Sequence, residues 1–202
     1  MKISSLEYKV DCLKKEIKTL DDKLQDLEAN ERRYSLIITG KSTPVFSQGE
    51  NSRLVANQLI KNQLRMDLQQ SDILSAFRLG KPPTSQGEDR RSILVKFRHH
   101  ETATEIKRSA KTVKPEGLFF SENLTPLRHS ILKALRKAKY AHSNIISGCG
   151  SWEGRVFVWI KPSNPAGNGV RSRRFSVNNL EELRKFCSDI LNESMELYAE
   201  NY

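Results

Sequence analysis

The chain has 202 residues and a formal net charge of +10, with 34 Lys and Arg against 24 Asp and Glu. Hydrophobic residues make up 37% of it, which suits small domains with thin cores rather than one large enzyme domain. No run approaches the ~18 apolar residues of a membrane-spanning helix and no signal sequence follows Met1, so we expect a soluble, intracellular protein without membrane partners.

The positive charge is concentrated in the middle of the chain. Residues 34–114 carry fourteen Lys and Arg against seven Asp and Glu, and residues 115–175 carry ten against three. Residues 1–33 are neutral, with eight of each sign, and residues 176–202 are acidic. A basic body of this kind attracts polyanions, of which nucleic acids are the commonest.

Residues 1–33 are predicted to form a coiled-coil helix, because apolar side chains recur at alternating spacings of three and four. These oligomerisation positions are Ile3, Leu6, Val10, Leu13, Ile17, Leu20, Leu24 and Leu27. With Ile3 as heptad position a, every d position is Leu, which favours a parallel dimer, but the flanking charges leave a trimer open. The alternative is an amphipathic helix that folds back on its own domain.

Residues 34–124 are predicted to form an α+β domain of order βαββαβ. The expected strands are 35–40, 73–79, 92–98 and 117–120, and the expected helices are 51–65 and 101–113. In the third strand apolar residues alternate with Lys96 and Arg98, so one side is apolar and the other partly basic. This order is that of a ferredoxin-like sandwich, an antiparallel sheet with two helices on one face.

Residues 125–191 are predicted to form a small α/β domain. Thr125 caps a helix that begins at Pro126 and runs through Tyr140. The expected strands are 144–147, 156–161 and 175–177, and a closing helix covers 180–191. Residues 162–174 are expected to be a mobile basic loop, and residues 192–202 an acidic tail.

The first helix of this domain carries a basic stripe. Its members follow helical spacing on one face: His129, Lys133, Arg136, Lys137 and Tyr140. An ordinary solvated helix face would look the same, but the stripe lies in the most basic segment of the chain. It is therefore a candidate nucleic-acid-binding surface.

Several phrases of the sequence resemble, in order and spacing, the first-open-reading-frame proteins of long interspersed (LINE) retrotransposons, and also the baculovirus few-polyhedra protein. They are RRYSLIITG, GENSR, DILSAFRLGK, RRSILVKF, FFSENLTPLRHSILKALRKAK and GRVFVWIKP, from about Arg32 to Phe186. The resemblance implies a homotrimeric coiled coil, a noncanonical RNA-recognition motif at 34–124 and a C-terminal nucleic-acid-binding domain at 125–191.

The function that the retrotransposon resemblance implies is binding of single-stranded RNA or DNA. Such a protein coats the RNA of its element as a nucleic-acid chaperone, in a cytoplasmic ribonucleoprotein or also in the nucleus. The viral resemblance leaves open a second class, a coiled-coil assembly adaptor or structural protein in which the coil and the acidic tail recruit protein partners.

The resemblance also implies which residues bind. Ordinary RNA-recognition motifs stack bases on strand aromatics, but Ile37, Ser92 and Leu94 stand at those positions, so basic residues are expected to hold the phosphates instead. In residues 34–124 the resemblance implies Arg78, Lys81, Arg90, Arg91, Lys96 and Lys111. Arg98, on the basic side of the third strand, is a further nucleic-acid-binding candidate. Arg128 matches the arginine of the family's interdomain cleft, and the remaining basic candidates of the C-terminal domain are Lys133, Arg136, Lys137 and Arg155.

The aromatic candidate is Trp152, flanked by Gly150, Ser151 and Gly154, where a stacked base would contribute roughly 1 to 3 kcal/mol. Trp159, within VFVWI, is at least as well explained as a core residue. No nucleophile elbow or phosphate-binding Gly-rich loop is present, and neither the four histidines nor the three separated cysteines have metal-ligand spacing. We therefore expect no enzyme, cofactor or metal site.

Overall fold

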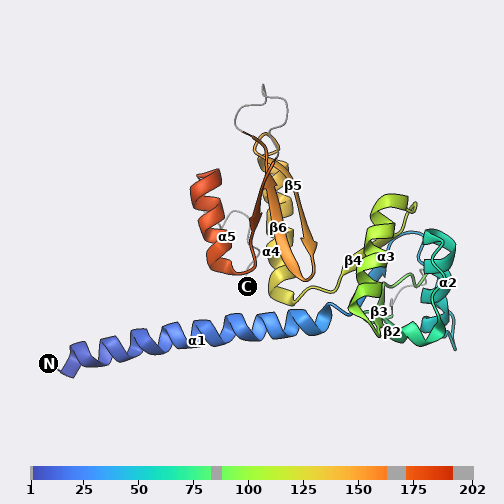
Figure 1. Cartoon of the computed structure of the whole chain (residues 1–202), viewed down its shortest axis with the longest axis horizontal. Coiled ribbons are helices and arrows are strands. Elements are labelled where there is room, and N and C mark those ends of the chain that lie inside the picture. Colours follow the sequence, from blue (N-terminus) through green and yellow to red (C-terminus); the bar gives the residue numbers. More distant parts are fainter. Residues whose placement is uncertain (1, 83–87, 163–171, 193–202) are drawn as a thin grey trace. The chain divides into compact units, whose positions relative to one another are not determined.

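The structure is a computed structural model that describes residues 2–82, 88–162 and 172–192, with side chains from Leu6 onward. The chain divides into two units (Figure 1): a middle unit, Arg32–Asn123, and a terminal unit that combines Met1–Glu31 with Leu124–Tyr202. Apart from Asn192, the predicted acidic tail lies outside the described residues, as does most of the predicted basic loop. None of the described helices is both long and apolar enough to span a membrane.

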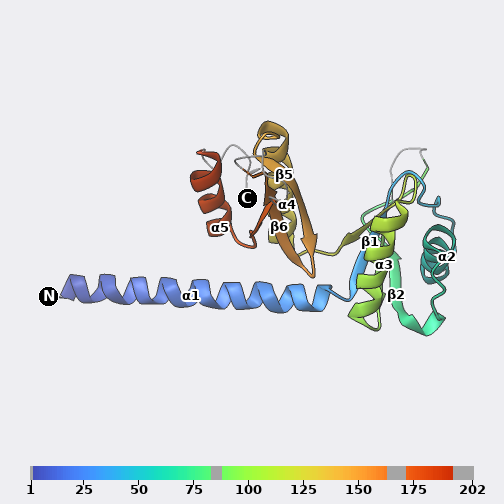
Figure 2. The ribbon, with the colours of Figure 1, turned by 45° about the horizontal axis from the view of Figure 1, so that its top comes forward.

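The terminal unit begins with α1 (Lys2–Arg32), one continuous helix of 31 residues (Figures 1 and 2). The seven seam residues from Leu6 to Leu27 are 46–67% exposed, and the Ile3 side chain lies outside the described residues. The contacts of α1 with the rest of the unit include two ion pairs, Lys18 with Glu181 and Asp26 with Arg128. Lys18 and Asp26 occupy heptad positions b and c, so α1 does not fold back through its apolar seam.

The middle unit contains a four-stranded antiparallel sheet and two helices, so the predicted α+β class is confirmed. Its elements are β1 (Ser35–Thr39), α2 (Ser52–Leu64), β2 (Ile73–Arg78), β3 (Ile93–Phe97), α3 (His100–Val113) and β4 (Phe119–Glu122). The strand order is β2-β3-β1-β4. Asn51 caps α2 as expected, because its side chain accepts hydrogen bonds from the backbone of Arg53 and Leu54.

One face of this sheet builds the core of the middle unit. Leu36, Ile38 and Val95 are almost fully buried against Ile60 of α2 and Ile106 of α3. Because side chains alternate along a strand, the other face carries the intervening residues. The helices thus occupy one layer and leave the second face of the sheet for other contacts.

The rest of the terminal unit is a second, smaller α+β arrangement. Its elements are α4 (Pro126–Ala141), β5 (Ile146–Trp152), β6 (Arg155–Ile160), β7 (Arg173–Ser176), α5 (Leu180–Phe186) and a π-helical turn (Cys187–Leu191). The sheet is antiparallel with the order β5-β6-β7, and α4 packs on one of its faces (Figure 1). Thr125 caps α4 as expected.

One predicted strand in this unit was misplaced. The strand expected at 144–147 is instead Ile146–Trp152, paired along its length with β6 in a hairpin. Trp152 therefore lies at the end of a strand. The closing helix covers 180–191 as predicted, with α-helical geometry to Phe186 and a π-helical turn from Cys187 to Leu191.

Candidate nucleic-acid interface

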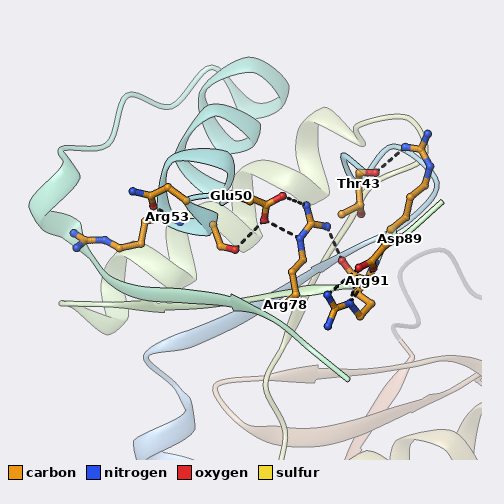
Figure 3. A network of polar contacts seen from close by, with 9 residues as sticks. Thr43, Glu50, Arg53, Arg78, Asp89 and Arg91 are labelled. Carbon is orange, nitrogen blue, oxygen red and sulfur yellow. Dashed lines mark hydrogen bonds and ion pairs between the residues drawn. The ribbon is translucent and has the colours of Figure 1, made fainter. Parts of the chain in front are cut away.

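Arg78, at the end of β2, forms a buried ion pair with Glu50 (Figure 3). Its Nε and Nη2 donate hydrogen bonds to the two carboxylate oxygens of Glu50 at 2.9 and 2.7 Å, and its Nη1 donates to the carbonyl oxygen of Arg91 at 2.9 Å. The two side chains are 3% and 4% exposed. The hydrogen bonds from Arg78 hold the pKa of Glu50 below its ordinary value, so Glu50 is a carboxylate and Arg78 is neutralised within the chain.

The neighbouring Arg91 is also engaged within the middle unit (Figure 3). It donates to both oxygens of Asp89, to Oδ1 from Nε at 2.9 Å and to Oδ2 from Nη2 at 2.8 Å, and from Nη1 to the carbonyl of Gly80 at 2.8 Å. These bonds lower the pKa of Asp89. Its guanidinium carbon also lies 5.4 Å from the ring centroid of Phe46, within the range of a cation–π contact.

Arg90 completes this group. It donates to Glu88 at 2.8 Å and to the carbonyl oxygen of Thr43 at 2.8 Å. Three predicted phosphate-binding arginines, 78, 90 and 91, thus each have a carboxylate partner in the same unit. The contacts tie the loop before β3 to the segment before α2, which is a structural role.

The other basic candidates of the middle unit lie at separate places. Lys81 and Lys111 are exposed, in the loop after β2 and near the end of α3. Lys96 is half-buried on the sheet face away from the helices. Arg98 is exposed, and its Nε donates to the carbonyl of Ser71 at 3.2 Å.

That same sheet face carries two aromatic residues that the sequence prediction missed. Phe77 of β2 pairs in register with Leu94, and Phe119 of β4 pairs with Thr39. They are 51% and 65% exposed. The prediction considered only the first and third strands, where Ile37, Ser92 and Leu94 stand.

Arg128, in the first turn of α4, is 4% exposed. Its Nη2 donates to Oδ1 of Asp26 on α1 at 2.5 Å, and its Nη1 donates to the carbonyl of Gly154 at 3.2 Å. Gly154 lies in the turn between β5 and β6. The residue expected in a nucleic-acid cleft therefore joins three elements of the terminal unit through its side chain.

The basic stripe of α4 is on the solvent side of the helix. Its five members are all exposed: His129, Lys133, Arg136, Lys137 and Tyr140. The opposite side of α4 packs Ile131 and Leu135, both fully buried, on the sheet. The predicted periodicity is thus confirmed, and the helix collects three cationic candidates on one surface.

Trp152 and Arg155 face each other across the end of the β5-β6 hairpin and share one face of the sheet. Trp159 is on this face too, because it lies an even number of residues from Arg155 on β6. It is half-buried and outside the hydrophobic core, which takes Val156 and Val158 instead. Of the two alternatives that the sequence left open for Trp159, the core position is therefore not the one that the structure shows.

In the described part of the chain, no cluster of three His, Cys, Asp or Glu side chains offers a metal site. The thiol of Cys149 has a pKa raised mainly by burial, which does not favour nucleophilic chemistry. A comparison with protein families finds no match for this chain, and a comparison with curated proteins finds none either. The surfaces that remain as candidates are the α4 stripe and the exposed sheet faces.

Proposed function

We propose that this protein is an oligomeric single-stranded nucleic-acid-binding protein, with the chaperone role on element RNA that its resemblance to LINE first-open-reading-frame proteins implies. The observation that carries the proposal is the exposed stripe of α4, where Lys133, Arg136 and Lys137 lie opposite a buried apolar side. Neutralising phosphates with such side chains releases counterions, which favours binding without sequence preference.

The middle unit is proposed to be a noncanonical RNA-recognition motif of the ferredoxin-like type. Its strand order, β2-β3-β1-β4, and the packing of α2 and α3 on one sheet face support this assignment. Its second face offers Phe77, Phe119 and Lys96 to a strand of nucleic acid. Base stacking there would use the edge strands rather than the central ones.

The oligomer is proposed to form through the α1 seam. A helix of 31 residues is ~46 Å long, and one side of it displays leucines, valine and isoleucine to solvent. Burying each such side chain contributes about 1.5–3 kcal/mol, so a second or third copy of this helix is the natural partner. Whether two or three chains associate depends on seam packing.

The mechanism follows from these parts. Each chain contributes several weak phosphate contacts, and the coil tethers identical chains, so segments of one strand rebind at high effective concentration. Individual contacts exchange while the whole complex stays bound. Strands held in this way can unpair from poor partners and anneal to better ones, which is nucleic-acid chaperoning.

A coiled-coil assembly adaptor is the second candidate. The observation that favours it is the internal pairing of Arg78, Arg90 and Arg91, because carboxylates already occupy these three guanidinium groups. In that case the exposed seam of α1 recruits protein partners and the basic surface is incidental. The two candidates differ in whether the protein binds single strands at moderate salt.

The test is equilibrium binding of single-stranded RNA across a salt series, with two matched variants. The dipeptide Arg-Lys occurs at 136–137 on α4 and again at 184–185 on α5, exposed in both places. Changing both residues of the α4 pair to Gln should lower the slope of log affinity against log salt by ~1.4, at ~0.7 for each lost phosphate contact. The same change on α5 should leave the slope unaltered.

The contribution of the coil is tested in the full chain with Leu13→Glu and Leu20→Glu, which keep the contacts of Lys18 and Asp26. Affinity for a long strand should fall by about a hundredfold, whereas affinity for a strand that fills one chain should change little. Absence of binding by the unaltered protein would favour the adaptor.

A further inference from the structure

One face of the β5-β6-β7 sheet carries aromatic and arginine side chains. The opposite face is the core, where Val156 and Val158 of β6 are fully buried under α4. Side chains alternate along a strand. Arg155, Phe157 and Trp159 therefore share the outer face, with Arg155 exposed and the two aromatic rings half-buried.

Glycines on the adjacent strand shape this outer face. Gly150 and Gly148 of β5 lie opposite Phe157 and Trp159 in the register. A Cβ added to Gly150 would lie 3.6 Å from ring carbon Cζ3 of Trp159, and one added to Gly148 would lie 3.8 Å from Cε3. The indole of Trp159 thus lies over the backbone of these two glycines, and the side chain as a whole is half-buried.

Arginines border the aromatic rings. Arg174 of β7 lies opposite Trp159 in the register, and its guanidinium carbon is 4.8 Å from the ring centroid of Phe157. The rings of Phe157 and Trp159 are 6.3 Å apart and tilted by 45°, so they do not stack face to face on each other. Guanidinium groups beside aromatic rings bind phosphates and also stack on bases through their flat faces.

We propose that this outer sheet face is a base-stacking platform for unpaired nucleotides, in which Trp152 and Trp159 stack bases while Arg155 and Arg174 hold the adjoining phosphates. The inference rests on the proposed single-strand binding and adds a site at which the protein contacts the bases as well as the phosphates. The exposed arginines favour a polyanion over an apolar protein partner on this face. The α4 stripe lies on the far side of the same sheet, so mutations separate the two sites.

Tryptophan fluorescence reports on the platform directly, because the chain has two Trp and both lie on this face. The probes are an oligothymidylate of about 20 nucleotides, longer than the ~4–16 that one small single-strand-binding fold covers, and an abasic strand of equal length and charge. We expect the oligothymidylate to quench the emission and to bind more tightly than the abasic strand.

Trp159→Ala should weaken binding of the oligothymidylate by roughly 5- to 140-fold, the range for loss of one stacked base, and leave the abasic affinity unchanged. Gly150→Val is the second variant. It keeps both tryptophans and improves the strand propensity of β5, but the valine side chain contacts the Trp159 ring. Because this contact should shift the ring, we expect a weaker preference for bases. Tyr8→Ala, at an aromatic residue on α1 that is 72% exposed and lies outside the seam, is the matched control and should keep that preference.

Two results would overturn the platform while leaving single-strand binding intact: equal affinity for the two strands in the unaltered protein, or a Trp159→Ala variant that keeps the full base preference. A change of oligomer mass in Trp159→Ala, measured by sedimentation, would also overturn it and assign the face to a second copy of the chain. If the unaltered protein binds neither strand, the proposed function and the platform both fail.

Discussion

Replacing Glu50 with Ala is expected to destabilise the middle unit by about 3–5 kcal/mol, because it leaves a buried guanidinium without its counter-charge. Arg78 is 3% exposed and donates two hydrogen bonds to Glu50, at 2.9 and 2.7 Å. Bonds that involve charged groups contribute ~1.5–3 kcal/mol each, so two of them give ~3–6 kcal/mol, in agreement with the range for a broken buried pair. The third bond, to the carbonyl of Arg91, remains in the variant.

Changing Glu50 and Arg78 together to Met removes both charges and is expected to restore most of the lost stability, because well-packed apolar side chains often replace a buried pair without loss. Glu88→Ala is the matched control. Its carboxylate pairs with Arg90 at the surface, where the side chains are 66% and 38% exposed, so we expect a loss below ~1 kcal/mol.

Urea unfolding followed by circular dichroism measures these differences. Tryptophan fluorescence does not report on this unit, because both tryptophans belong to the terminal unit. Hydrogen exchange of peptides from β1 and β3 localises the effect to the middle unit. A contrary result would be that Glu50→Ala lowers the free energy of unfolding by less than Glu88→Ala does, or that the double variant is no more stable than Glu50→Ala. In either case the ion pair does not stabilise this unit, and Arg78 is again a candidate for binding phosphate.

Three further outcomes follow from the geometry. The pKa of Glu50 lies below its ordinary value of 4.5, chiefly because Arg78 hydrogen-bonds its carboxylate, so the stabilisation is present above pH 4.5 and declines as the pH falls through the lowered pKa. Glu50→Gln should therefore reduce the loss of stability at acid pH in urea denaturation curves, whereas an unchanged loss would show that other carboxylates cause it. Thr125→Ala removes the acceptor for the backbone N–H of Arg128 and should lower the urea midpoint by the equivalent of ~1 kcal/mol, whereas an unaltered midpoint would show that the cap is dispensable. Cys12 is exposed and occupies heptad position c, so a fluorophore attached there does not block the seam. Chains labelled at Cys12 with a donor and chains labelled with an acceptor should show energy transfer when mixed, and no transfer at micromolar concentration would count against association through α1.

The middle unit was predictable from sequence because its signals are local. Alternation in SILVKFR places Ile93, Val95 and Phe97 on the buried face, and Asn51 marks the start of α2. β5 was misplaced because Gly148 and Gly150 carry no side chains to show alternation. Its strand conformation is stabilised by pairing with β6 and by the Trp159 ring, which are contacts between segments rather than within one.

The candidate site divides in the same way. The position of the α4 stripe on one exposed side of the helix depends on helical spacing alone, so that position was predicted correctly. The partners of the arginines were not predictable: Glu50 precedes Arg78 by 28 residues, and Asp26 precedes Arg128 by 102. A list of basic residues shows where positive charge lies in a chain. It does not show which charges are neutralised by carboxylates brought close by the fold.

Arg128 connects the two halves of the proposed function. Burying a guanidinium has a desolvation penalty that its carboxylate and carbonyl partners offset only in part, so Arg128 adds little net stability to the unit. Its hydrogen bonds do fix the orientation of α4 relative to α1 and to the β5-β6 turn. In the proposed coil, Asp26 at heptad position c lies on the side of α1 away from the seam, and its bond to Arg128 holds the first turn of α4 on that side. Asp26→Ala should therefore loosen the stripe relative to α1. Affinity for a short strand should stay nearly constant, while the avidity for a long strand, which depends on fixed spacing between stripes, should fall.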